Sequence, residues 1–294
     1  MKQQIEENAF QRGTSMKIAL IQMSMSEDQA ENVQKAVKRI KEAAQKGAKI
    51  VALPEVFTSV YFPTRKKYDA EKHAETIPGP IEKELSKAAK ENKVVLVAGS
   101  IYEKDGKKFY NTAMIFDENG ELLGKYRKMH IPHDPNFYEQ DYFEKGDLGY
   151  SVFETKYGKI AVLICYDQWF PEAARIVSLM GAQIIFYPTA IGLPGNTKQF
   201  EGNWQEAWEA VQRGHSIANA TIVATINRVG KEVDTKFWGN SFVYSQFGTL
   251  LAKGKEKEEI IYANVDLELG KRIEEGWMFF KHRRPETYGR LTKK

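Results

Sequence analysis

The chain has 294 residues, 42% of them hydrophobic and 28% charged, and 43 basic against 39 acidic residues give it a formal net charge of +4. This ordinary composition predicts a globular fold with a sizeable core. The charges are mixed along the chain without a long basic block, and no apolar run is long enough to cross a bilayer, so we expect neither a nucleic-acid nor a membrane partner.

The first residues and the cysteine content indicate a setting for the protein. Met1–Ser15 is polar and lacks the apolar centre of a signal peptide, and an apolar pattern begins at Met16. We interpret residues 1–15 as an expression leader, with a native N-terminal arm as the alternative. Residues 16–294 are predicted to form a single domain, because no stretch rich in Pro, Gly and Ser divides them. One cysteine allows no internal disulfide, which favours a reducing, cytoplasmic location.

In the N-terminal half, the pattern of apolar residues predicts strands that alternate with helices. Lys17–Met23 is almost continuously apolar, as in a buried strand, and apolar residues at helical spacing from Val33 to Ala44 predict a helix that ends near Gly47. The next predicted elements are a strand at Ile50–Leu53, a helix from Pro80 to about Asn92, a strand at Val94–Ser100, and a hairpin of Phe109–Phe116 and Leu122–Tyr126 around Asp117–Gly120.

The C-terminal half continues this alternation and ends in strands that look antiparallel. A strand at Lys159–Ile164 ends at Cys165, and a helix follows from Pro171 to Met180. The later predicted elements are a strand at Gln183–Tyr187, a helix at Trp204–Asn219, and strands at Thr221–Ile226, Ser241–Tyr244, Thr249–Ala252 and Glu259–Val265. Alternating strands and helices interrupted by hairpins predict a layered α/β domain with mixed sheets.

Two segments share a plan in which an apolar strand is followed at once by a reactive side chain. These segments are Ile50–Glu55 and Ile160–Cys165. Ligands in α/β folds bind beyond the carboxyl ends of strands. We therefore expect Glu55 and Cys165 to share one crevice.

Cys165 is a candidate nucleophile because of its position between a strand and a helix. A lone cysteine beside an apolar run is more often an inert core residue. After Cys165, however, the sequence turns polar at once and a helix begins at Pro171. A thiol at a strand-to-helix turn meets N–H groups and the positive end of a helix, which stabilise both a thiolate and a developing oxyanion.

A nucleophilic cysteine needs a base, and histidine is the usual partner. None of the five histidines stands at the end of a predicted strand. His130 and His133, with Asp134, offer a metal site as an alternative, although no third ligand has a recognisable spacing. Glu55 emerges from a buried strand, which suits a general base, whereas an isolated glutamate is more often a surface residue.

A cluster of cations offers an oxyanion stabiliser. Lys125, Arg127 and Lys128 fall within four residues, a density that usually indicates a solvated face. An inward-facing ammonium at one of these positions would stabilise a tetrahedral oxyanion. The residues alone do not choose among the three.

At these residues the chain resembles the nitrilase, or carbon–nitrogen hydrolase, superfamily, over about Met16 to Gly289. The matching motifs are Ala52–Glu55, Lys125–Pro132, and Ile164–Asp167 with Phe170–Glu172. The resemblance implies a four-layer α-β-β-α sandwich, a catalytic triad of Glu55, Lys128 and Cys165, and no metal or cofactor. It also implies that Glu139 orients the lysine and the substrate, and that subunits associate through helices as a homodimer or a larger homo-oligomer.

Within the superfamily, three stretches resemble N-carbamoylputrescine amidases: Cys165–Arg175, Phe186–Gly192 and Asn227–Glu232. This implies hydrolysis of a small ureido substrate to putrescine, carbon dioxide and ammonia through a thioester-type intermediate, with the Tyr166 N–H assisting Lys128. The alternatives are an amidase, an omega-amidase or a β-ureidopropionase-like enzyme on another small substrate, and a non-catalytic binding protein on the same scaffold.

The substrate pocket is less defined by the sequence. Plant-type relatives carry an acid just after Gly192, where this chain has Leu193–Gly195, and Glu201 or Glu206 would have to replace it. Asp167 is a candidate contact for a substrate ammonium or a helix cap. Trp169 is a candidate apolar or cation–π wall, or a core residue. The arginines that bind carboxylates in relatives acting on N-carbamoyl-D-amino acids are absent after Cys165, so anionic substrates are expected to be rejected unless Arg175 or Arg228 reaches the pocket.

Overall fold

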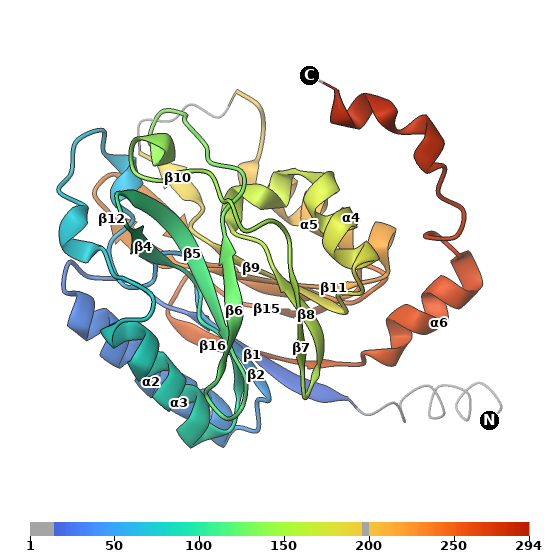
Figure 1. Ribbon diagram of the computed structural model, residues 1–294, viewed down its shortest axis with the longest axis horizontal. Coiled ribbons are helices and arrows are strands. Elements are labelled where there is room, and N and C mark those ends of the chain that lie inside the picture. The colour runs from blue at the N-terminus through green and yellow to red at the C-terminus, as the bar shows by residue number, and fades with distance from the viewer. Residues whose placement is uncertain (1–14, 196–199, 294) are drawn as a thin grey trace.

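The computed structural model describes residues 15–195 and 200–293 and shows mixed β-sheets packed face to face between two layers of helices (Figure 1). Helices α2 (Gln29–Gln45) and α3 (Pro80–Asn92) cover one sheet, and α4 (Pro171–Leu179) and α5 (Trp204–Asn219) cover the other. This arrangement confirms the predicted four-layer α-β-β-α sandwich. The interpretation of residues 1–15 as a leader falls almost wholly outside the described residues.

The two large sheets each combine parallel and antiparallel neighbours. In the first sheet the order is β16 (Glu259–Val265), β1 (Met16–Gln22), β2 (Ile50–Ala52), β3 (Val95–Val97), β5 (Lys108–Phe116), β4 (Ile101–Asp105), with β6 (Leu122–Arg127) also paired to β5. In the second it is β15 (Leu250–Lys253), β14 (Phe242–Tyr244), β11 (Ile222–Asn227), β9 (Ile184–Thr189), β8 (Gly158–Val162), β7 (Val152–Thr155). A small antiparallel sheet joins β10 (Gly192–Pro194), β13 (Thr235–Trp238) and β12 (Val229–Glu232).

Strand β1 shows why the predicted strands are apolar on both faces. Ile18 and Leu20 point into the core between the two sheets, whereas Ala19 and Ile21 point into the core beneath α2 and α3. A strand that is buried on both faces cannot alternate polar and apolar residues. The continuous apolar run is therefore a consequence of the layered architecture.

The helix boundaries follow from local chemistry that the sequence shows. The Asp28 carboxylate caps α2 by accepting a hydrogen bond from the Glu31 N–H at 3.1 Å. Asn203 caps α5 in the same way. Pro80 and Pro171 are the first residues of α3 and α4, where proline loses no helical hydrogen bond. Helices α3, α4 and α5 match their predicted ranges to within one residue, whereas α2 begins at Gln29, four residues before the predicted apolar spacing starts at Val33.

Several elements were not predicted. They are the strands β4, β7, β10, β12 and β13, and helix α6 (Glu268–Trp277). Helix α6 has no fully buried residue and lies at one end of the sandwich, where it covers neither large sheet (Figure 1). Among the described residues, no helix combines the length and apolarity that a bilayer crossing requires.

The sheets bring the two reactive segments to one edge of the sandwich. Strand β2 is parallel to β1 and β3, and β8 is parallel to β9. Glu55 lies three residues after the end of β2, and Cys165 lies three residues after the end of β8. Lys128 directly follows β6.

Candidate active site

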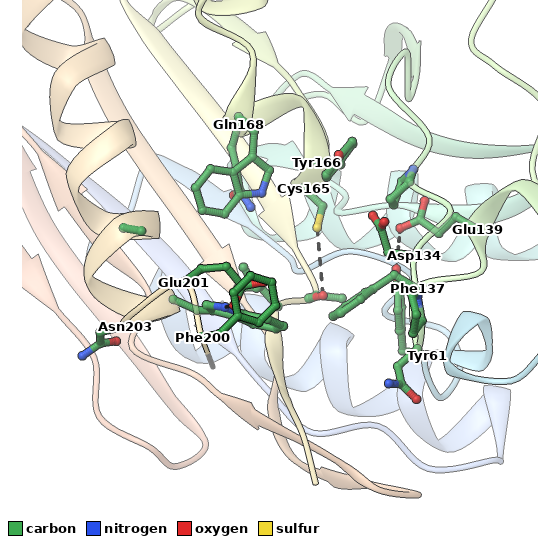
Figure 2. Close-up of a pocket in the computed structure, with 18 residues that line it drawn as sticks. Tyr61, Asp134, Phe137, Glu139, Cys165, Tyr166, Gln168, Phe200, Glu201 and Asn203 are labelled. Atoms are coloured by element: carbon green, nitrogen blue, oxygen red, sulfur yellow. Dashed lines mark hydrogen bonds between the residues drawn. The ribbon is translucent and has the colours of Figure 1, made fainter. Parts of the chain in front are cut away.

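A cavity of about 630 Å³ lies beside Cys165. This volume is typical of sites that bind small molecules. Figure 2 shows the Cys165 sulfur between one wall that carries Phe200 and Glu201 and another that carries Phe137 and Glu139. The cavity is lined by Tyr61, Pro132, Asp134, Pro135, Asn136, Phe137, Glu139, Cys165, Tyr166, Gln168, Trp169, Ala190, Ile191, Phe200, Glu201, Asn203, Trp204 and Ala207.

Cys165 begins a short 3-10 helix, Cys165–Trp169, shortly after strand β8 ends. Its φ of +43° lies in the left-handed region, which costs energy for a residue with a Cβ and is typical of functional turns. Its sulfur lies 4.0 Å from the Ala190 carbonyl oxygen. Burial raises the pKa of the Cys165 thiol well above its usual range, and the charge of Glu55 raises it further. The resting thiol is therefore protonated and needs a base to react.

The turn at Cys165 also supplies donors. The first N–H groups of any helix have no partner within it, and Tyr166 occupies such a position. The Tyr166 side chain lines the cavity and packs edge-on against Phe170, with ring centroids 5.4 Å apart. The arrangement fits the predicted use of the Tyr166 N–H as an oxyanion donor.

Glu55, Lys128 and Glu139 meet in a fully buried cluster. The Lys128 Nζ lies 2.8 Å from Glu55 Oε1 and 2.7 Å from each carboxylate oxygen of Glu139. Burial lowers the pKa of Lys128, but the two carboxylates outweigh burial and hold it above its ordinary value. Lys128 is therefore an ammonium at neutral pH.

Glu55 retains one oxygen for chemistry. Its Oε1 accepts hydrogen bonds from Lys128 and from Asn111 Nδ2, each at 2.8 Å. Its Oε2 is buried and has no hydrogen-bond partner among the described residues. A buried carboxylate oxygen without a partner is rare and suits an acceptor of a substrate-derived or thiol proton.

The neighbouring cations of Lys128 have other roles. Lys125 pairs with Glu103, and Arg127 binds Glu103, Asp105 and Asp147. Arg127 is buried, so the interpretation of this whole segment as a solvated face is wrong for Arg127. Only Lys128 of the three reaches the cluster that contains Glu55.

Glu139 and Tyr61 connect the buried cluster to the cavity. Burial raises the pKa of Glu139 to about 7, against the opposing charge of Lys128. The Tyr61 hydroxyl donates a hydrogen bond to Glu139 Oε1, and both residues line the cavity. Sequence reasoning missed Tyr61, because nothing in the Val60–Phe62 stretch separates it from an ordinary core tyrosine.

Gly146 allows the main chain at Lys128 to be held closely. The Gly146 N–H donates to the Lys128 carbonyl at 2.8 Å. A Cβ at this position would lie 2.1 Å from the Arg127 carbonyl oxygen, which is too close for any real contact. A side chain here would push the segment that carries Lys128 out of place.

Asp167 is a structural residue, which corrects the hypothesis of a substrate contact. Its carboxylate is fully buried and does not line the cavity. One oxygen accepts from the main-chain N–H and Nδ1 of His130, at 3.0 and 2.7 Å, and the other accepts from the Tyr126 hydroxyl and the Ile164 N–H, both at 2.8 Å. Asp167 thus ties the segment around Lys128 to the turn that carries Cys165.

The histidines considered for a metal site do not converge. The His130 ring faces Asp167 and stacks on Phe170, and His133 lies 3.8 Å from Asp141. Within the described part of the chain, no group of three His, Cys, Asp or Glu side chains is placed to hold a metal ion.

The charged side chains on the cavity wall are all acidic among the described residues: Asp134, Glu139 and Glu201. Glu201 Oε2 accepts a hydrogen bond from Trp204 Nε1 at 3.2 Å. Of the two acids proposed to replace the missing one after Gly192, Glu201 lines the cavity and Glu206 does not. Asp134 also lines it, although the sequence had suggested only a metal ligand there.

Of the remaining residues predicted to reach the pocket, Trp169 lines the cavity and the two arginines do not. Trp169 is also partly buried and packs against the aromatic cluster behind it. Arg175 donates to the Ala218 carbonyl and Arg228 to main-chain carbonyls of the Glu55 loop, and neither lines the cavity. No arginine or lysine stands on the described part of the wall to bind a substrate carboxylate.

Gln168 is a wall residue that sequence reasoning missed. Its Oε1 accepts from Trp208 Nε1 at 2.9 Å. Because an indole nitrogen can only donate, this contact fixes which end of the amide is the oxygen. The Gln168 Nε2 is left buried without a partner among the described residues.

The family and the relatives agree with this geometry. A family model for carbon–nitrogen hydrolases matches residues 17–274. The chain is 39% identical to N-carbamoylputrescine amidase of Solanum lycopersicum over 92% of this chain and 93% of the relative. It is 36% identical to citrullinase of Francisella tularensis over 95% of this chain and 99% of the relative. The crystal structure of a carbon–nitrogen hydrolase from Helicobacter pylori G27 superposes with a TM-score of 0.90 at 36% identity, over 95% and 99% of the two chains. The chain therefore belongs to the carbon–nitrogen hydrolase family, the nitrilase superfamily, and is a cysteine-dependent hydrolase.

Proposed function

We propose that this enzyme hydrolyses N-carbamoylputrescine. The observation that carries the proposal is the charge of the cavity: Glu139 is paired with Lys128, but Asp134 and Glu201 also line the described wall, and no lysine or arginine stands on that wall. A substrate carboxylate would enter that cavity without a counter-ion, which is costly in a partly desolvated site. An alkylammonium tail would instead approach Asp134 and Glu201. The identity to plant N-carbamoylputrescine amidases supports the same substrate.

The proposed first half-reaction forms a covalent intermediate. Glu55 takes the proton of the Cys165 thiol, and the sulfur forms a bond to the ureido carbonyl carbon. The Lys128 ammonium and the Tyr166 N–H stabilise the oxyanion, an effect that is larger in a dry site than in water. Glu55 then returns its proton to the terminal nitrogen, the C–N bond breaks, and ammonia leaves a carbamoyl thioester on Cys165.

The second half-reaction restores the thiol. Glu55 takes a proton from water, and the hydroxide adds to the thioester carbonyl. The C–S bond breaks, Cys165 regains the proton from Glu55, and the carbamate product decomposes to putrescine and carbon dioxide. Each step uses only groups of this site and water.

Citrulline is the second candidate, because one wall group suits it. Citrulline has the same ureido group and chain as N-carbamoylputrescine, with a carboxylate added to the carbon that bears the ammonium. The unpartnered Gln168 Nε2 is a neutral donor that could bind such a carboxylate. The relative named citrullinase supports this candidate.

The matched pair of substrates separates the two candidates. Ammonia release is measured for N-carbamoylputrescine, citrulline, N-carbamoyl-β-alanine, N-carbamoyl-D-amino acids and simple amides. We expect kcat/KM for N-carbamoylputrescine to exceed that of the carboxylates by at least about tenfold, or about 1.4 kcal/mol in transition-state binding. Equal or faster turnover of citrulline would replace the proposal, and preferred turnover of a simple amide would assign an amidase. Loss of activity on chelation, restored by zinc, would instead favour the metal alternative.

A further inference from the structure

A buried ion pair stands behind the loop that carries Glu55. Arg228 lies between β11 and β12 and is fully buried, and Glu232 at the end of β12 is 7% exposed. The Arg228 Nη1 lies 2.7 Å and 2.9 Å from the two carboxylate oxygens of Glu232. Neither residue lines the cavity, and the proposed chemistry uses neither.

The pair holds both ends of the loop from Glu55 to Tyr61. Arg228 Nη2 donates to the carbonyl oxygens of Glu55 and Val56, at 2.8 and 2.9 Å. Glu232 Oε2 accepts from the Tyr61 N–H at 2.5 Å. The contacts join residues about 170 positions apart in the chain, so they connect the β12 segment to the loop after β2.

The loop needs holding because it is strained. Val56 is β-branched yet has a φ of +45°, a conformation that costs on the order of 1–3 kcal/mol. Its carbonyl is bound by Arg228 and its N–H by the Ser100 hydroxyl at 2.9 Å. Such strain persists only where surrounding contacts fix it. Without Arg228, Val56 should relax toward an unstrained backbone conformation and shift the adjacent Glu55.

The contacts then continue into the buried cluster and close a ring. Tyr61, whose main chain is bound by Glu232, donates its hydroxyl to Glu139. Glu139 binds Lys128, which binds Glu55, whose main chain is bound by Arg228. A shift of the loop would therefore move Glu55 and the support of Lys128 together.

We propose that Arg228 and Glu232 are positioning residues, which set the place of Glu55 directly and that of Glu139 through Tyr61. The inference rests on the proposed role of Glu55 as the base. A buried ion pair contributes little net stability compared with apolar residues of the same size, so stability alone does not account for it. Because the pair does not touch the cavity, its loss should lower kcat and leave KM nearly unchanged.

Two conservative variants test the pair. Arg228→Lys keeps the charge, but a single ammonium cannot match the planar fork that binds two carbonyls and a carboxylate. Glu232→Gln keeps a side-chain oxygen for the Tyr61 N–H but removes the charge that balances Arg228. Leu85→Ala is the matched control, because Leu85 is fully buried on α3 beneath the other face of the sheet. It should lower the melting temperature without changing kcat below that temperature.

The measurements are kcat and KM, the melting temperature, and the second-order rate of Cys165 alkylation by iodoacetamide followed by mass spectrometry. We expect both pair variants to lose at least about tenfold in kcat with KM within about twofold. We also expect alkylation to slow toward the rate of Glu55→Gln, a readout that needs no substrate.

Three outcomes distinguish failure of the inference from failure of the proposed function on which it rests. Wild-type kcat and alkylation in either folded pair variant, with only a lower melting temperature as in Leu85→Ala, would show an ordinary structural ion pair. A rise in KM at unchanged kcat would likewise overturn the positioning role. Wild-type alkylation and turnover in Glu55→Gln would instead remove Glu55 as the base. If Arg228→Lys does not fold, Glu232→Gln carries the test.

Discussion

The Lys128 ammonium lies 2.8 Å from Glu55 Oε1, and both side chains are fully buried. The contact keeps one glutamate oxygen bound to a cation and leaves the other, Oε2, without a partner among the described residues. An acceptor and a cation are thus held side by side next to the thiol of Cys165, whose pKa both charges affect.

Replacing the nucleophile should stop the reaction without disturbing the fold. We expect Cys165→Ala to abolish turnover, because no thioester can form. Iodoacetamide should inactivate the wild type in proportion to alkylation of Cys165. Circular dichroism and the melting temperature check the fold, and ammonia release checks activity. Substantial activity in the folded variant would refute the mechanism.

Removing the oxyanion cation should cost more than removing its neighbour. We expect Lys128→Ala to lower kcat by at least about 10²–10³-fold, the usual cost of losing one oxyanion donor. Lys125→Ala is the control, because Lys125 pairs with Glu103 away from the cavity, and it should retain most activity. Steady-state kinetics of both variants test this prediction. If activity required Lys125 but not Lys128, the assignment of Lys128 as the oxyanion stabiliser would be wrong.

The pKa of Glu139, raised to about 7, should appear as an acid limb in the pH profile. Below about pH 7 Glu139 takes up a proton and no longer balances Lys128, so Lys128 binds Glu55 more strongly and kcat falls. In Glu139→Gln this limb should be absent. An unchanged limb in that variant would assign it to another group.

The same pKa has a consequence for stability with a definite sign. The folded state binds the Glu139 proton more tightly than the unfolded state, whose pKa is near 4.5. Folding therefore takes up a proton between about pH 4.5 and 7, and this contribution to stability grows as the pH falls through that window. When the pH is lowered from about 7.5 to about 5, the melting temperature of the wild type should therefore rise relative to that of Glu139→Gln, which lacks the titrating carboxyl.

The acidic wall should contribute to binding of a cationic substrate. We expect Asp134→Asn and Glu201→Gln each to raise KM for N-carbamoylputrescine by about 1.4- to fivefold, since exposed charge pairs contribute about 0.2–1 kcal/mol. Glu206→Gln is the control, because Glu206 does not line the cavity. Added salt should raise the wild-type KM and have less effect on the KM of a variant that carries both Asp134→Asn and Glu201→Gln. Equal effects of all three changes would exclude a specific role for the wall.

Loss of Asp167 should destabilise the protein strongly. The Ala variant leaves several buried donors without an acceptor, among them the Ile164 N–H and the Tyr126 hydroxyl, at a cost of about 1–3 kcal/mol for each. Asp105→Ala removes an exposed partner of Arg127 and should cost no more than about 1 kcal/mol. Denaturant unfolding measures both. Wild-type stability in Asp167→Ala, with weaker binding of the amine substrate, would restore Asp167 as a substrate contact.

The sequence by itself indicated a layered α/β domain with mixed sheets and the ends of the reactive strands, while the number of layers came from the resemblance. Continuous apolar runs such as Lys17–Met23 and Ile160–Ile164 indicate strands buried on both faces, because that burial constrains every residue of the run. Glu55 and Cys165 were predicted to share a crevice because parallel strands end at a common edge. Pro80 and Pro171 located the starts of α3 and α4, since a proline in the first turn is a local signal. The choice of Lys128 came only from the resemblance.

Tertiary structure alone decided how each polar side chain is used. Asp167 and Glu201 look alike in sequence, yet one is enclosed by four donors from several segments and the other faces the cavity. Local patterns also say nothing of the role of Arg228, whose partners include the main chain at Glu55, 173 positions away. Burial and hydrogen-bond partners depend on which segments the fold brings together, and local patterns of propensity and hydrophobicity carry no record of those distant neighbours.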